Sequence, residues 1–177
     1  MLFFLENQPT LSDQMRAIIS SRTIQALIIS VGTMLFCQVL KFIIFSIRNK
    51  RLEWHLLIST GGFPSSHTGF CVSLDASLLI LQLNIDGKLD WSFAVAAVFS
   101  IIIIHDAMGV RLEASKHARI LNKIADNLTL EEKEELGYGR KGRLKEMLGH
   151  RFREVVGGFI VGIVAGVLGA FMCVWWG

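Results

Sequence analysis

Two histidines in this sequence lie in surroundings that suit a chemical role. His67 follows Pro64, Ser65 and Ser66 in the stretch GGFPSSHTG. Proline and serine are typical of the first turn and the N-cap of a helix, so His67 is predicted to lie beside backbone N–H groups that the helix leaves unpaired. Because such groups bind anions, this motif predicts a phosphate site.

The second histidine precedes an acidic residue in LKEMLGHRFREVVGG. His150 and Glu154 are four residues apart, and side chains at this spacing share one face of a helix. The carboxylate of Glu154 can therefore hold one ring N–H of His150. The other ring nitrogen is left available for chemistry.

Basic residues accompany both motifs. Lys41 and Arg48 are seven residues apart, with Gln38 three residues before Lys41, so the three side chains are predicted to line one helical face. Arg111 follows the pair His105-Asp106. We expect all these groups to converge at one end of the fold.

The elements that position these residues are predicted to be membrane helices. The chain has 177 residues, of which 52% are hydrophobic and 19% charged, and its mean hydropathy is +0.50. This is more apolar than a soluble domain of the same length. Roughly 17–25 apolar residues span a bilayer as a helix. The sequence therefore predicts an all-α membrane bundle, formed as a single domain over residues 1–177, with spans at about Thr23–Ile47, Ser66–Leu83, Trp91–Met108 and Val155–Trp176.

Two further parts flank these spans. Residues 1–22 are predicted to form an N-terminal segment at the membrane interface, with a mixed stretch from Leu11 to Ser21. Residues 109–153 form a polar loop with short helices. In that loop Thr129 and Glu132 predict a capping box, and a basic turn runs from Gly139 to Gly142. Apolar spacing of three and four extends the third helix out of the membrane, through Val110, Ala114, His117, Leu121 and Ile124.

Lysine and arginine counts predict the orientation. Three of the 18 basic residues lie between the first and second spans, and eleven lie in the long polar loop. Only Arg16, Arg22 and Lys88 lie on the opposite side. The positive-inside rule therefore predicts that both polar loops and the candidate site face the cytoplasm and that both termini lie outside.

Together, GGFPSSHTG, HDAMGVRLEASKHA and LKEMLGHRFREVVGG resemble the divergent branch of the type 2 phosphatidic acid phosphatase and vanadium haloperoxidase superfamily. That superfamily has the pattern K-x6-RP, then PSGH, then SR-x5-H-x3-D. Here Lys41 and Arg48 have the K-x6-R spacing, PSSH ends at His67, and His150 and Glu154 match H-x3-D. The resemblance covers roughly Lys41 to the C-terminus.

The sequence also departs from this pattern. Asn49 stands in place of the proline, Ser66 in place of the glycine and Glu154 in place of the aspartate. The arginine expected six residues before His150 is Leu144, and Arg143 is one position away. Superfamily members usually have six membrane helices, so four spans imply that only the catalytic core is present.

The resemblance implies a lipid phosphate or diphosphate phosphatase that needs neither a metal nor another cofactor. His150 would be the nucleophile and form a phosphohistidine, Glu154 would orient it, and His67 would be the general acid. The groups implied to bind the phosphate oxygens are Lys41, Arg48, Ser65, Ser66, Arg111 and Arg143.

Two other functions fit the same residues. One is a phospholipid-headgroup binder or membrane adaptor without catalysis, built on a decayed phosphatase core. The other is a metal-dependent enzyme that uses His105, Asp106, Glu113 and Glu154. The expected partners are a lipid phosphate substrate and membrane lipids, with no nucleic acid.

The sequence also makes two predictions about packing between the spans. The fourth span carries Gly158, Gly162 and Gly166 at intervals of four, a pattern suited to close helix packing either within the bundle or in a homo-oligomer. Asp75 and Lys41 lie at comparable depth in neighbouring spans. Because an unpaired charge in a membrane is costly, the two are predicted to form an ion pair.

Overall fold

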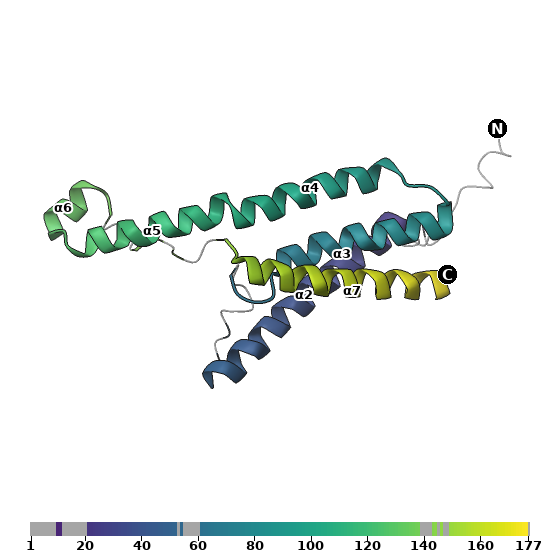
Figure 1. The fold of residues 1–177 in the computed structure, drawn as a ribbon, viewed down its shortest axis with the longest axis horizontal. Helices are drawn as coiled ribbons and strands as arrows, with labels where there is room; N and C mark the ends of the chain where they lie inside the picture. Colours follow the sequence, from purple (N-terminus) through teal and green to yellow (C-terminus); the bar gives the residue numbers. More distant parts are fainter. Residues whose placement is uncertain are drawn as a thin grey trace.

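The structure is a computed structural model and describes residues 10–11, 21–52, 54, 61–138, 143–144, 146 and 149–176. Most of the predicted interfacial segment and the Gly139–Gly142 turn lie outside these residues. The described part is all-α, as predicted, and shows no strand (Figure 1). Its elements are α2 (Arg22–Asn49), α3 (Ser66–Leu81), the π-helical turn η3 (Gln82–Asp86), α4 (Trp91–Met108), α5 (Val110–Asp126), α6 (Leu130–Glu135) and α7 (Phe152–Trp176).

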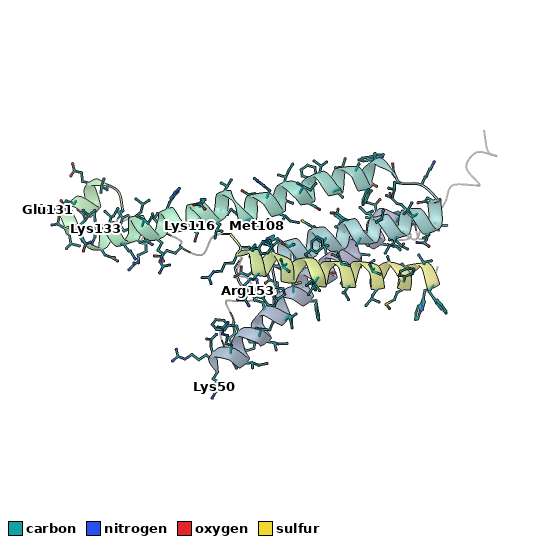
Figure 2. All side chains as sticks on the ribbon, viewed as in Figure 1. Lys50, Met108, Lys116, Glu131, Lys133 and Arg153 are labelled. Atoms are coloured by element: carbon teal, nitrogen blue, oxygen red, sulfur yellow. The ribbon has the colours of Figure 1, made fainter. Side chains whose placement is uncertain are left out.

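Four helical stretches are long and apolar enough to cross a membrane, which confirms the predicted spans: Arg22–Asn49, Ser66–Asp86, Trp91–Asp126 and Phe152–Trp176. Many apolar side chains on α2, α4 and α7 stay exposed, as expected for helices whose solvent is lipid. Charged side chains gather at one end. Figure 2 shows Lys50, Lys116, Lys133 and Arg153 on that side of the molecule.

The bundle is centred on α3, which packs most extensively against α7 and also contacts α2 and α4. Glycines on α7 allow this close approach. A Cβ on Gly158 would lie 2.3 Å from the carbonyl oxygen of Ser65, and one on Gly162 would lie 2.8 Å from the Cβ of Val72. α3 therefore covers the glycine face of α7, so these glycines serve close packing within the bundle. A homo-oligomer through this face would have to displace α3.

The third span continues as a helix beyond the bundle, as predicted. α5 follows α4 after a break at Gly109 and carries α6 near its tip (Figure 1). The predicted capping box is present: the Glu132 N–H donates to the Thr129 hydroxyl, and the Glu132 carboxylate accepts from the Thr129 N–H. The Thr129 backbone N–H, together with the hydroxyl, holds the pKa of Glu132 below its usual value.

The buried side of α5 differs from the one that apolar spacing predicts. Val110, Leu121 and Ile124 are exposed, whereas Ala118, Asn122 and Ala125 are buried. The polar loop after α6 returns along this second face, through hydrogen bonds to Asn122. A buried polar residue thus decides which side of α5 is covered.

The predicted ion pair between Asp75 and Lys41 is wrong. The Asp75 carboxylate is hydrogen-bonded to Ser100 of α4, and Lys41 donates to the Gln38 side chain at 2.8 Å. Asp75 therefore faces α4, whereas Lys41 lies on α2, on another side of α3. Ser100 is a neutral neighbour, so the half-buried carboxylate gains no second charge, and its Oδ1 atom has no hydrogen-bond partner among the described residues.

Candidate active site

His150 and Glu154 form a buried pair at the start of α7. The His150 side chain is 3% exposed, and its Nδ1 lies 3.1 Å from Glu154 Oε2. Because an ionised carboxylate only accepts hydrogen bonds, Nδ1 carries a proton, and in the neutral imidazole Nε2 keeps its lone pair. The same carboxylate also accepts from the backbone N–H groups of Arg151 and Gly62. Three donors thus hold Glu154 in one orientation, and Glu154 in turn holds the imidazole.

The position of His150 is set by the junction between α4 and α5. The His150 N–H donates to the carbonyl oxygen of Ala107 at 3.0 Å. Gly149 precedes it with φ +81°, and a Cβ there would lie 2.6 Å from the backbone nitrogen of Leu112. Only glycine adopts this conformation at low cost and lets the chain pass so close to α5. The end of the polar loop is thereby attached to the third span.

The N-terminus of α3 faces this pair. The Ser65 hydroxyl is the N-cap and accepts from the Thr68 N–H at 3.3 Å, while the Ser65 N–H donates to the Glu154 carbonyl at 2.9 Å. This last bond joins the PSSH motif directly to the histidine motif. The Ser66 hydroxyl is fully buried and has no hydrogen-bond partner in the described residues. A buried hydroxyl at a helix N-terminus is available to bind an anion.

The two histidines face each other. The ring centroids of His67 and His150 are 6.1 Å apart, with their planes at 50°. His67 is exposed, unlike His150, and it lies within the electrostatic influence of His150, Lys41 and Arg111. The structure therefore brings together both histidines, Glu154 and two cationic side chains at one end of the bundle.

Lys41 is the buried cation of the site, with 2% of its surface exposed. The charge of Glu154 acts on it, and Gln38 accepts a hydrogen bond from its ammonium group. Gly62, with φ +102°, lies over the lysine stem, where a Cβ would be 3.1 Å from Lys41 Cδ. Gly62 is therefore part of the site, a role that motif spacing alone did not indicate.

The other predicted phosphate-binding arginines differ in their positions. Arg111 is half exposed and forms an ion pair with Asp106 at 2.5 Å. Arg48 lies in the last turn of α2, is exposed, and makes no hydrogen bond or ion pair with the described site residues. Arg143 lies along α5, where it pairs with Asp126 at 3.1 Å. Of the three, only Arg111 lies within the electrostatic influence of a site histidine, His67. Ser65 serves as the helix cap.

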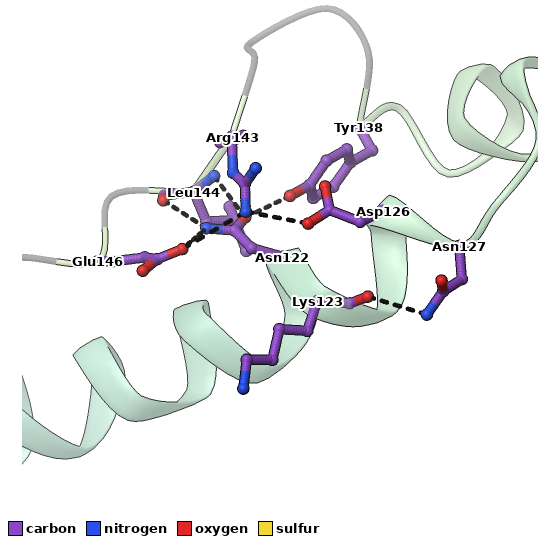
Figure 3. Close-up of polar contacts among 8 residues, drawn as sticks. All are labelled: Asn122, Lys123, Asp126, Asn127, Tyr138, Arg143, Leu144 and Glu146. Atoms are coloured by element: carbon purple, nitrogen blue, oxygen red, sulfur yellow. Dashed lines mark hydrogen bonds and ion pairs between the residues drawn. The ribbon is translucent and has the colours of Figure 1, made fainter.

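Asn122 is a structural residue of this region that the sequence motifs did not reveal. Its side chain is fully buried and pairs with the backbone of Leu144, accepting from the N–H and donating to the carbonyl, both at 2.9 Å (Figure 3). It also donates to the Glu146 carboxylate and accepts from the Tyr138 hydroxyl. One amide thus fixes the loop that leads to His150.

The residues of the metal-dependent alternative do not gather. Asp106 pairs with Arg111, and Glu113 pairs with Lys116. Across the described ranges, no group of three or more His, Cys, Asp and Glu side chains is placed to hold a metal ion. The arrangement therefore does not support that alternative.

Comparisons with known proteins identify the family. Residues 23–165 match the divergent PAP2 family. The chain is 35% identical over 144 residues to YuiD, an uncharacterized membrane protein of Bacillus subtilis (strain 168), and the alignment covers 78% of this chain and 89% of that protein. No solved structure shows significant similarity. Because the family match covers most of the sequence and the relative is 35% identical over most of its length, this chain belongs to the divergent PAP2 family.

Proposed function

We propose that this protein is a membrane lipid phosphate or diphosphate phosphatase that works through a phosphohistidine on His150. The observation that carries the proposal is the buried His150–Glu154 pair facing His67 at the N-terminus of α3. This pair leaves Nε2 of His150 as a nucleophile. The buried, unpartnered Ser66 hydroxyl and the buried Lys41 supply groups for the phosphate oxygens.

The spacing of the two rings supports this assignment. A nucleophile in a near-attack position lies about 3–3.5 Å from the atom it attacks, and a general acid lies about 2.6–3.2 Å from the leaving oxygen. The ring centroids of His67 and His150 are 6.1 Å apart, so both imidazoles are close enough to act on a single phosphoryl group. One phosphoryl group can therefore contact both imidazoles.

The reaction has two steps on these residues. His150 Nε2 attacks phosphorus and the bond between phosphorus and the lipid oxygen breaks, while protonated His67 gives its proton to the leaving alkoxide. His67 then takes a proton from water, which attacks the phosphohistidine and releases inorganic phosphate. Glu154 stabilises the positive charge on His150, and Lys41 stabilises the negative charge on the equatorial oxygens.

A second function, headgroup binding without turnover, is favoured by the cationic residues. Arg48 and Arg143 lie away from the histidines, and Arg111 is held by Asp106. Lys41 is then the main buried cation for the phosphate. The site therefore has fewer cationic side chains than the motif pattern implies. Such a site would still bind a lipid phosphate through Lys41 and the α3 N-terminus.

Turnover by purified protein separates the two functions. In detergent, wild-type protein is expected to release phosphate from phosphatidic acid or a lipid diphosphate, and vanadate is expected to inhibit it. The His67→Ala variant is expected to lose about 10²- to 10⁴-fold on monoesters and less on diphosphates, because a phosphate leaving group needs less protonation. Binding of these lipids without any release of phosphate would favour the headgroup binder.

We also infer that the site faces the cytoplasm, because the basic residues concentrate on its side of the membrane. In a Cys173→Ser background, a cysteine introduced at Glu134 of α6 is expected to resist an impermeant thiol reagent in intact cells. A cysteine at Lys88, beyond the opposite end of α3, is expected to react. The reverse labelling pattern would place the site and its substrate on the outer side.

A further inference from the structure

One face of α5 carries apolar side chains that the rest of the chain leaves uncovered. Val110, Leu121 and Ile124 are 67%, 51% and 54% exposed. The polar loop packs on a different face of the helix, around Asn122. The uncovered face, which we call the α5 stripe, runs from the first turn of α5 to its last. It consists of Val110, Ala114, His117, Leu121 and Ile124.

The α5 stripe lies in water, unlike the exposed apolar side chains of α4. Together α4 and α5 cover the 36 residues Trp91–Asp126, or about 54 Å of helix rise, whereas the hydrocarbon of a bilayer is roughly 30 Å thick. α4 is apolar over most of its length, but α5 carries four basic and two acidic residues. It continues in the direction of α4, away from the bundle (Figure 1). Lipid therefore solvates α4 and does not solvate the α5 stripe, which is typical of a protein-binding surface.

The spacing of the α5 stripe is that of a coiled coil. Successive members are four, three, four and three residues apart, over residues 110–124. This heptad spacing keeps side chains on the seam between two helices that wind around each other. No lysine, arginine, aspartate or glutamate occupies the stripe, so two such stripes can meet without burying a pair of like charges.

We propose that the α5 stripe binds the same stripe of a second copy of this chain, as a parallel two-stranded coiled coil. All copies insert into the membrane in one orientation, so their α5 helices project from the same face, parallel and at the same height. A two-fold axis along the membrane normal therefore brings identical residues together, with Leu121 opposite its counterpart. Two heptads are marginal for free helices, but anchoring in one membrane raises their effective concentration.

The charges and the topology of the chain favour a second copy as the occupant. α5 has more basic than acidic residues, whereas α6 has four acidic residues and one basic residue. Two copies side by side therefore present both signs of charge and do not repel as two wholly basic helices would. α2 starts and α7 ends at the end of the bundle opposite α5 (Figure 1), so the bilayer separates these two helix ends from the stripe. The candidate site lies within one chain, so this association is not a condition for turnover and the two inferences fail independently.

Cysteine cross-linking of the full chain in native membranes tests the pairing. In a Cys173→Ser background, Leu121→Cys places two thiols at facing positions of the seam, and oxidation with copper phenanthroline is expected to give a disulfide-linked dimer. Arg119→Cys is the matched control, because Arg119 is also exposed but lies about 200° around the helix from Leu121. It is expected to give about tenfold less dimer.

The product of this cross-linking identifies the occupant. A product of twice the chain mass from Leu121→Cys, well above the yield from Arg119→Cys, supports the second copy. Equal yields from the two positions would show random collision and overturn the pairing. A product of another mass would show that a different protein covers the α5 stripe, and the absence of any product would show that no copy lies against it. Both results would overturn the proposal.

A charged side chain in the seam provides a second test on purified protein. Leu121→Glu sets two carboxylates against each other across the two-fold axis, and it is expected to raise the dimer dissociation constant in detergent by about tenfold or more. Leu136→Glu adds the same charge at a position that is 71% exposed and lies outside the α5 stripe, so it is expected to leave the constant unchanged. Light scattering over a concentration series gives both constants, and an unchanged Tm shows that each variant is folded. Equal dissociation constants for the two variants would contradict the coiled coil.

Discussion

Replacing His150 with alanine is expected to reduce turnover of lipid phosphates by about 10⁴-fold or more, because His150 is the histidine that the described residues place beside His67. Glu154→Gln is expected to lose roughly 10²- to 10⁴-fold, since an amide no longer stabilises the positive charge that develops on His150. Both variants keep Lys41 and the N-terminus of α3. Phosphate release by purified protein and binding of inorganic phosphate are the two measurements.

The matched control is His117→Ala. His117 is exposed on α5, and its removal leaves the described site intact, so its turnover is expected to equal that of wild type. Phosphate binding by His150→Ala would show that the protein remains folded and that chemistry alone is lost. Undiminished turnover by His150→Ala would exclude the phosphohistidine route.

Gly158→Ala is expected to destabilise the packing of α7 on α3. The new Cβ would lie 2.3 Å from the carbonyl oxygen of Ser65 and 3.0 Å from the Cβ of Thr68. Backbone cannot yield as a flexible side chain can, so α7 and α3 must separate. Overpacking of this kind costs about 1–3 kcal/mol and is expected to lower the Tm in detergent. It also stretches the hydrogen bond from Ser65 to Glu154 that joins the two motifs, so turnover falls too.

Gly32→Ala provides the comparison. Gly32 is also a helix glycine, in α2, but a Cβ there has nothing within 4 Å. It is expected to leave Tm unchanged or to raise it slightly, because alanine favours a helix over glycine by roughly 0.5–1 kcal/mol. Similar Tm values for the Gly32 and Gly158 variants would contradict the close packing of α3 on α7.

Local patterns predicted the spans and the contacts within each helix. α4 has the bounds that its apolar run indicates, Ser65 caps α3, Thr129 and Glu132 form the capping box, and His150 meets Glu154 one turn later. Each of these depends on residues at most four positions apart or on a continuous apolar run. Helix geometry fixes such neighbours within a helix and at its cap, so the sequence contains that information directly. His150 lies two residues before α7, and its hydrogen bond to Ala107 also sets its position beside Glu154.

Contacts between helices were decided only by the tertiary structure. Lys41 and Arg48 were predicted on one helical face, yet Lys41 is buried beside Glu154, whereas Arg48 is exposed where α2 diverges from the other helices (Figure 1). Asp75 contacts α4 instead of α2, and Asn122 selects the covered face of α5. Periodicity gives the direction of a side chain around its own helix. The distance to another helix depends on the crossing angle and on how closely glycine faces allow two backbones to approach. The spacing of residues along one helix specifies neither of these.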